Sequence, residues 1–158
     1  MKEKKSKKKI IIIYQYFGSK NTKWSTRWYD FAIALSKKYN VTIITSNFVR
    51  SDLPNVRVFK RIHIDRINIE IYPFGDGNNY SFFRRIVNSI FFSFIITFRL
   101  LFSNYEKYIF SVGPITASFA SLFISRNKTI VEFRDLWPDG AFEMNKLPLL
   151  FKPFLFHY

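Results

Sequence analysis

The feature that most constrains the fold of this chain is a run of β-branched apolar residues near its amino terminus. Residues 10–14 read IIIIY, and the turn-forming residues Gly18, Ser19 and Asn21 lie just beyond them. A strand that is apolar on both faces has to be covered on both faces, which is typical of a central parallel strand in an α/β sheet. We therefore expect residues 10–14 to form a buried parallel strand.

The segment after this strand changes its hydrophobic period. Its apolar positions recur at intervals of three and four and include Trp28, Phe31, Ala32, Leu35 and Tyr39. This spacing predicts an amphipathic helix over 25–38, capped by Ser25 or Thr26. The apolar residues 41–45 then predict a second buried strand. Strand, helix and strand in this order make a βαβ unit with parallel strands.

The rest of the chain continues the alternation of strands and helices. Further strands are expected at 56–60, 67–72, 107–110 and 129–133, and helices at 82–102 and at 114–125, the last opened by Pro114. A chain of 158 residues is the size of one α/β domain. The predicted fold class is an open parallel α/β sheet with helices on both faces.

The predicted helix over 82–102 is the most hydrophobic part of the chain. Its charge-free stretch, from Ile86 to Phe98, has thirteen residues, whereas a membrane-spanning helix needs about 20. We weigh three alternatives, namely a helix in the membrane interface, a buried core helix and a membrane span, and length disfavours the span. For a helix in the membrane interface, Arg84 and Arg85 at one end and Arg99 at the other end would face the lipid head groups. The expected membrane contacts are Phe91, Phe92, Phe94, Ile95, Phe98, Arg84 and Arg85.

The net charge of +14 favours an anionic partner. Six lysines lie within residues 2–9, and we interpret residues 1–9 as a basic, disordered tail in preference to a signal peptide, because no small-residue cleavage site follows. Nucleic acid is disfavoured as a partner, since the aromatic residues occupy apolar strand and helix positions. The absence of cysteine excludes disulfides and thiolate metal sites, and the two isolated histidines predict no metal site.

Two segments follow buried strands and are therefore candidates for the functional site. The first, YFGSKNTKWSTRW, contains Gly18 but no phosphate-binding glycine motif, which disfavours nicotinamide and nucleoside triphosphate enzymes. The second, VEFRDLWPDGAFEM at 131–144, crowds acidic and basic side chains into one turn. Glu132, Arg134 and Asp135 are candidates for polar groups facing a cleft, and a structural ion pair is the alternative interpretation.

Four segments in this order resemble the amino-terminal domain of the family 4 glycosyltransferases, in particular the bacterial subgroup that assembles capsule and O-antigen sugars. They read IIIIYQYFG, STRWYDFAIALSKKYNVTIITSN, YIFSVGPITA and VEFRDLWPDGAFEM. The resemblance covers roughly residues 9–150, and the RDLWPD turn is its most specific part. It implies one Rossmann-like half of a GT-B fold, which consists of two such domains facing a cleft.

The resemblance implies a retaining transfer of sugar from a nucleotide sugar to a glycan or lipid-linked acceptor, without a cofactor or an obligatory metal. It implies that Asp135 is the catalytic position and reaches the sugar that is transferred. Substrate-binding positions are expected at Arg134, Glu132, Gly18, Trp24 and Arg27. It also implies a cytoplasmic protein that lies peripherally on the anionic inner face of a bacterial plasma membrane.

The sequence departs from the family pattern in two ways. The first loop has one glycine where the family often has a pair, which weakens the case for phosphate contact at Gly18. The donor-binding half is missing, so we expect a domain over 10–147, a cut linker over 148–158 and no activity from the chain alone. It would then be a fragment, a frameshifted remnant or a partner of a separate donor-binding subunit. The alternative is a basic membrane-surface or nucleic-acid-binding module without catalysis.

Overall fold

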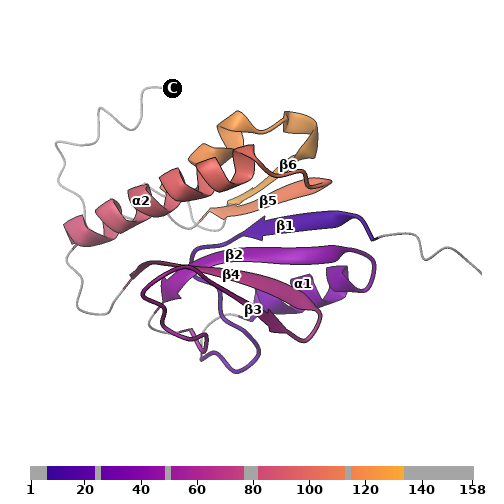
Figure 1. The fold of residues 1–158 in the computed structure, drawn as a ribbon, viewed down its shortest axis with the longest axis horizontal. Coiled ribbons are helices and arrows are strands. Elements are labelled where there is room, and N and C mark those ends of the chain that lie inside the picture. Colours follow the sequence, from indigo (N-terminus) through magenta and orange to yellow (C-terminus); the bar gives the residue numbers. More distant parts are fainter. Residues whose placement is uncertain (1–6, 24–25, 49–50, 77–81, 113–114, 134–158) are drawn as a thin grey trace, which may run out of the picture.

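A six-stranded sheet organises the chain, in the order β3-β4-β2-β1-β5-β6 (Figure 1). The computed structural model describes residues 7–23, 26–48, 51–76, 82–112 and 115–133. The strands are β1 (Lys9–Ile13), β2 (Asn40–Phe48), β3 (Lys60–Ile64), β4 (Ile67–Asp76), β5 (Lys107–Val112) and β6 (Thr129–Phe133). All pair in parallel except β3, which is antiparallel to β4. The predicted parallel sheet is thus confirmed.

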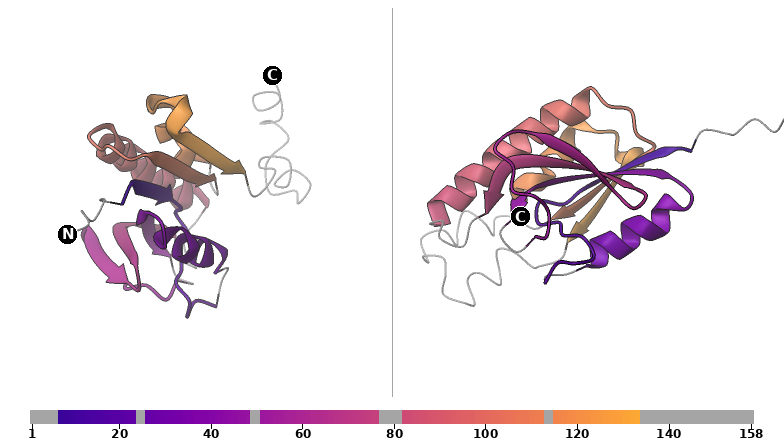
Figure 2. Two further views of the ribbon diagram at one scale, coloured as in Figure 1. Left: turned by 90° about the vertical axis from the view of Figure 1, so that its right-hand side faces the viewer. Right: turned by 60° about the horizontal axis from the view of Figure 1, so that its bottom comes forward.

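Helices cover both faces of this sheet, as predicted (Figure 2). The helix α1 (Arg27–Ser36) lies on one face, and α2 (Phe82–Leu101) lies on the other together with the 3₁₀ helix η1 (Ile115–Phe123). A short 3₁₀ turn, η2 (Arg126–Lys128), leads into β6. The fold class is therefore a Rossmann-like α/β sheet with one antiparallel edge strand.

The central strand β1 divides the interior into two cores. Ile10 and Ile12 pack on the α1 side, whereas Ile11 and Ile13 pack on the α2 side. Each of the four side chains is at most 4% exposed. The alternation of side chains along a strand explains why both faces need apolar cover, and why the sequence has isoleucine at every position.

The third strand was predicted at 56–60, which is wrong, because β3 begins at Lys60. The side chain of Asn47 donates to the carbonyl of Val56 at 2.6 Å and accepts from its amide at 2.9 Å. These bonds occupy the backbone N–H and C=O groups of Val56, which in a strand would pair with a neighbouring strand. The hairpin turns instead at Asp65, whose φ of 53° is left-handed, and pairs β3 with β4.

Two predicted helices differ in detail from the structure. A helix over 114–125 was predicted, and residues 115–123 form one of the 3₁₀ type, while Pro114 lies outside the described residues. A 3₁₀ helix rises about 2.0 Å per residue, against about 1.5 Å for an α-helix, so this short segment can return along the whole length of β5. In α1, Thr26 is the N-cap residue but makes no capping hydrogen bond; its hydroxyl donates to Asp30 at 3.0 Å.

Residues 7–9, which were predicted to belong to the disordered tail, belong to the sheet or contact it. The Lys7 ammonium donates to the carbonyl of Ser36 at 2.8 Å, and Lys8 pairs with Glu106 at 2.8 Å. Backbone amides of neighbouring segments donate to the carbonyls of Lys8 and Lys9. The predicted basic tail therefore excludes residues 7–9, and residues 1–6 lie outside the described ranges.

Helix α2 has two apolar faces. Phe92, Ile96 and Leu100 are buried in the core on its inner face. Phe92 was predicted to be a membrane contact, which its complete burial contradicts, and Ile95 is only partly buried against the same core. The outer face leaves Phe91, Phe94 and Phe98 between 51% and 62% exposed, as expected. In the described ranges, no helix is both long and apolar enough to cross a bilayer.

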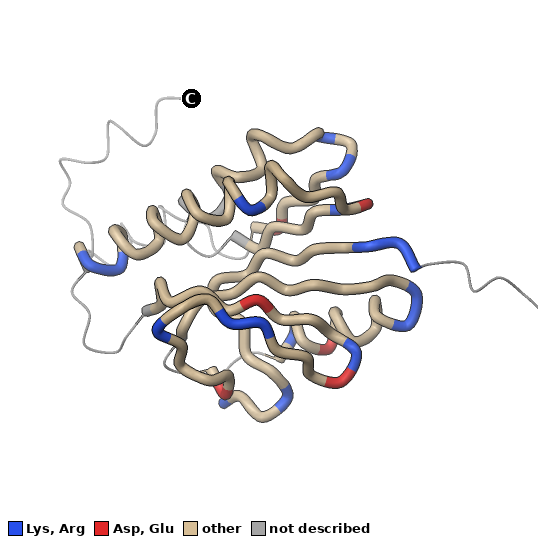
Figure 3. Tube along the Cα trace, viewed as in Figure 1, with Lys and Arg blue, Asp and Glu red and all other residues tan. Residues whose placement is uncertain are grey.

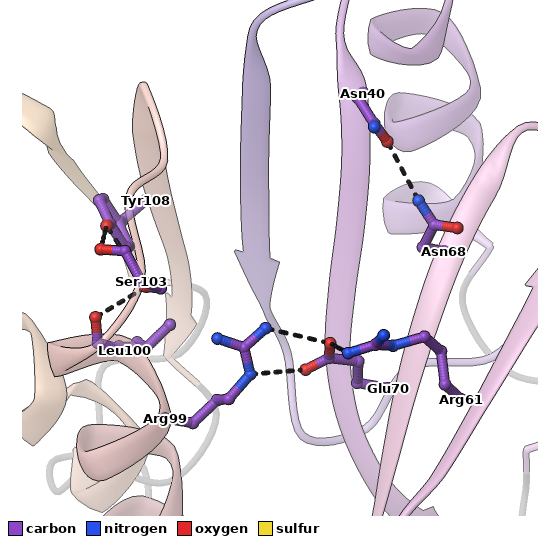
Figure 4. A network of polar contacts seen from close by, with 8 residues as sticks. All are labelled: Asn40, Arg61, Asn68, Glu70, Arg99, Leu100, Ser103 and Tyr108. Atoms are coloured by element: carbon purple, nitrogen blue, oxygen red, sulfur yellow. Dashed lines mark hydrogen bonds and ion pairs between the residues drawn. The ribbon is translucent and has the colours of Figure 1, made fainter.

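A buried carboxylate joins α2 and β3 to β4. Glu70 on β4 is 1% exposed. Arg61, directly opposite on β3, donates to it at 2.6 Å, and Arg99 of α2 donates at 3.2 and 3.3 Å (Figure 4). Burial lowers the pKa of Arg99, but the hydrogen bonds and charge of Glu70 outweigh this effect and raise it. Burial, with the Glu70 charge nearby, raises the pKa of Tyr72 to about 12.

We predict that Glu70→Gln lowers the free energy of unfolding by about 1–3 kcal/mol, because it leaves two arginines around a neutral buried amide. Urea unfolding followed by circular dichroism measures this change. The control is Glu106→Gln, whose ion pair with Lys8 is solvent-exposed, and for which we expect little change. Equal unfolding midpoints for the two variants would contradict a stabilising role for Glu70.

Candidate functional site

The carboxyl ends of the parallel strands form one edge of the sheet, and the loop from β1 to α1 begins there. Helix α1 starts at Arg27 and runs back along the sheet, so its first residues lie at this edge (Figure 2). Ser111 and Glu132, near the ends of β5 and β6, are directly paired in the sheet register. In open α/β sheets this edge is where ligands bind.

Four residues at this edge form a chain of hydrogen bonds, which we call the carboxyl-edge cluster: Arg27, Trp28, Ser111 and Glu132. The indole N–H of Trp28 donates to the Ser111 hydroxyl at 2.8 Å. That hydroxyl donates to Glu132 Oε2 at 2.7 Å, and the Arg27 guanidinium contacts Glu132 Oε1. The cluster therefore joins α1 to the two strands at one end of the sheet.

The solvent exposure of the cluster increases from one end to the other. Ser111 and Trp28 are buried, whereas the side chains of Glu132 and Arg27 are 20% and 63% exposed. Both oxygens of the Glu132 carboxylate already accept hydrogen bonds within the cluster. The guanidinium has five N–H donors in a planar fork, which suits phosphate or carboxylate groups. The exposed end can thus offer a cation to an anionic ligand, with Glu132 holding that cation in place.

Packing explains why position 18 is a glycine. It is buried, and a Cβ atom at this position would lie 2.6 Å from the Thr22 hydroxyl oxygen, which is too close for any side chain. The next backbone amide, that of Ser19, donates to Asp52 at 2.6 Å and is therefore not available to a phosphate. The structure gives Gly18 a role in the loop and gives its predicted role in phosphate binding no support.

Gln15, just beyond the end of β1, is a further polar residue at the same edge, and it lies on the α2 side of the sheet. Gln15 is 2% exposed, and its amide nitrogen donates to the Ser89 hydroxyl at 3.4 Å. Its Oε1 atom has no hydrogen-bond partner within the described ranges. Buried amide oxygens are normally paired. A donor from a ligand, or from another part of the chain, would satisfy this atom.

Of the predicted site residues, the structure brings together Arg27 and Glu132. Trp24, Arg134 and the predicted catalytic Asp135 lie outside the described residues, although Arg134 and Asp135 follow closely on Glu132 in the sequence. Gln15 and Ser111 were not among the site residues predicted from the sequence. Both are polar residues at the carboxyl end of an apolar strand, and that position was the signal which could have found them.

Comparisons with known proteins leave the family open. No protein-family model matches the sequence, and no curated protein matches it. A solved structure described as trehalose-6-phosphate from E. coli bound with UDP-2-fluoro glucose is similar, with 4% sequence identity and a TM-score of 0.45. The match covers 73% of this chain and 29% of that chain. A likeness at this level identifies no activity, and the fold class follows from the strand order and the helix positions.

We predict that Ser111→Ala lowers the free energy of unfolding by about 1–3 kcal/mol, because it removes the acceptor of the buried Trp28 indole. The indole N–H should also exchange faster with deuterated solvent. Ser125→Ala is the control, since Ser125 is exposed and makes no side-chain capping bond. Unchanged indole exchange in Ser111→Ala would show that Trp28 does not depend on this hydrogen bond.

Proposed function

We propose that this chain is the acceptor-side half of a retaining glycosyltransferase, which moves a sugar from a nucleotide sugar to a glycan or lipid-linked acceptor in surface polysaccharide synthesis. The observation that carries the proposal is the carboxyl-edge cluster, which lies at the ligand-binding edge of a parallel sheet and directly precedes the RDLWPD turn. The resemblance of that turn to family 4 glycosyltransferases supports the reaction class.

The cluster has the charges that such a transfer needs. As the bond between the sugar and the diphosphate breaks, negative charge develops on the leaving diphosphate. The diphosphate then takes up the proton that the acceptor hydroxyl loses when the new glycosidic bond forms. Arg27 is exposed and cationic, so we assign it to the anionic part of the substrate. Glu132 orients Arg27, and Asp135 reaches the sugar. This assignment uses no metal ion.

The proposal includes a second domain. Arg27 is 63% exposed, so the cluster has solvent on one side. A transfer reaction needs the donor and acceptor to be held together with water excluded, which one open wall does not achieve. We propose that a donor-binding domain faces the carboxyl edge and supplies most of the contacts to the nucleotide sugar.

The proposed setting is the inner face of a bacterial plasma membrane, where the protein is peripheral. The exposed phenylalanines of α2 support a membrane setting, as does the net charge of +14. A lipid-linked acceptor would be reached from this position. The alternative, a basic surface-binding module without catalysis, keeps the membrane and omits the transfer.

The test is sugar transfer by an enzyme in which this chain is joined to a donor-binding domain. We expect Asp135→Asn to lower kcat by roughly 100-fold or more, and Glu132→Gln to lower it by roughly tenfold, since one loses a group on the sugar and the other an orienting partner. The thermal unfolding midpoint should change little in Asp135→Asn.

The control is Asp30→Asn, whose carboxylate lies on α1 and accepts from Thr26, outside the cluster. It should keep the wild-type kcat. Full activity in both Asp135→Asn and Glu132→Gln would remove the carboxyl edge from the reaction and contradict the proposal.

A further inference from the structure

The polar contacts of Glu70 bring two arginines from different elements to one point of the sheet. Arg61 donates from one nitrogen to Glu70 Oε1 at 2.6 Å, and Arg99 donates from two nitrogens at 3.2 and 3.3 Å (Figure 4). Figure 3 shows basic residues on β3 and near the end of α2, on either side of β4. Arg99 was expected at lipid head groups, and it contacts this carboxylate instead.

These contacts leave an excess of positive charge near the surface. Two guanidiniums carry two positive charges, and the Glu70 carboxylate cancels one of them. Glu70 is 1% exposed, whereas the side chains of Arg61 and Arg99 are 58% and 30% exposed. One arginine that donates from two nitrogens, as Arg99 does, already pairs a buried carboxylate. The second arginine therefore offers a cation beyond what Glu70 needs.

Tyr72 supplies a third donor group at the same place. It follows Glu70 by two residues on the same face of β4, and it is only 7% exposed, with its ring against Phe59 and Phe92. Its hydroxyl makes no hydrogen bond within the described ranges, where the one buried side-chain atom without a partner is Gln15 Oε1. The Tyr72 hydroxyl thus reaches solvent and has no partner in the described part of the chain.

The electrostatics of Tyr72 place its hydroxyl beside both arginines. Its pKa is raised to about 12, chiefly by burial and then by the charge of Glu70, while the charges of Arg99 and Arg61 act in the opposite direction. A group that is affected by all three charges lies close to them. At neutral pH the hydroxyl keeps its proton and can donate it, so three donor groups surround one buried carboxylate.

We propose that Arg61, Arg99 and the Tyr72 hydroxyl form a binding site for a phosphate group. The planar N–H groups of a guanidinium match two phosphate oxygens. Arg61 uses one of its three nitrogens for Glu70 and makes no other hydrogen bond within the described ranges. A tetrahedral phosphate has enough oxygens to accept from three side chains, whereas a planar carboxylate has only two.

This site is separate from the carboxyl-edge cluster. Glu70 lies within β4, beside Ile44 in the sheet register, and contacts α2. The carboxyl-edge cluster includes Arg27 and Trp28 of α1, which covers the opposite face of the sheet. The inference therefore does not rest on sugar transfer. A phosphate bound here would join β3 to α2, so it should stabilise the folded chain.

The experiment is a titration of the 158-residue chain with sodium phosphate at constant ionic strength, followed by the ¹H–¹⁵N signals of the arginine Nε–H groups. We expect saturable shifts of the Arg61 and Arg99 signals and a higher thermal unfolding midpoint. Sodium acetate, whose anion is planar, should bind more weakly. Glycerol 3-phosphate distinguishes the sources of the phosphate group, because its binding shows a site for phosphate monoesters and its failure to bind shows a site for the free ion.

Two variants test the donors. Tyr72→Phe keeps the ring and removes the hydroxyl, so we expect phosphate to bind roughly tenfold more weakly, as for the loss of one hydrogen bond to a charged group. Arg61→Lys keeps the charge and loses the planar set of donors, and it should also weaken binding. The matched controls are Tyr29→Phe, whose hydroxyl donates to Asp65 on the α1 side of the sheet, and Arg66→Lys in the exposed turn between β3 and β4.

Both controls should bind phosphate as the wild type does, and circular dichroism should show the same fold for all variants. Wild-type affinity in either Tyr72→Phe or Arg61→Lys would overturn the proposal. So would a titration that does not saturate, or acetate binding as tight as that of phosphate. Equal losses in the controls would trace the binding to the net charge of +14 and not to this site.

Discussion

The rest of the structure depends on one constraint, the burial of β1 on both faces. Ile10 to Ile13 are almost fully buried and belong alternately to the two cores. Because β1 lies between β2 and β5 with helices on both sides, its polar groups and its loop emerge only at the ends of the strand. The carboxyl end is followed by Gln15 and by the loop to α1, so the same burial that stabilises the sheet places the candidate site at its edge.

The five parallel strands are well predicted from the sequence because the pattern of their apolar residues is local, a continuous run in β1 and an alternation in β4. The pattern also locates β6, although none of its residues is buried. It fails for β3, whose start depends on a pair of hydrogen bonds between Asn47 and Val56, and on a left-handed residue at Asp65. It also fails for Phe92, because the pattern of α2 is apolar on both sides and does not indicate which side faces the sheet.

The candidate site, too, is predicted only in part, because its contacts join residues that are far apart in the sequence. The sequence identifies Arg27 and Glu132 separately, as members of two segments that follow strands. Their contact, and the hydrogen bonds through Ser111 to Trp28, join residues that are far apart in the chain. Such contacts depend on strand order and register, which a single sequence does not specify. The structure supplies that register, and with it the connections between polar residues that the sequence identifies only one by one.

The central claim is that the carboxyl edge is one wall of a two-domain transfer site. The most direct measurement compares sugar transfer from labelled UDP-, GDP- and dTDP-sugars to membrane lipids, by this chain alone and by the chain fused behind Tyr158 to a family 4 donor-binding domain. The account predicts transfer by the fusion protein and none by the chain alone, because only the fusion protein encloses donor and acceptor. Equal transfer by the chain alone, or none by the fusion protein from any donor, would contradict it.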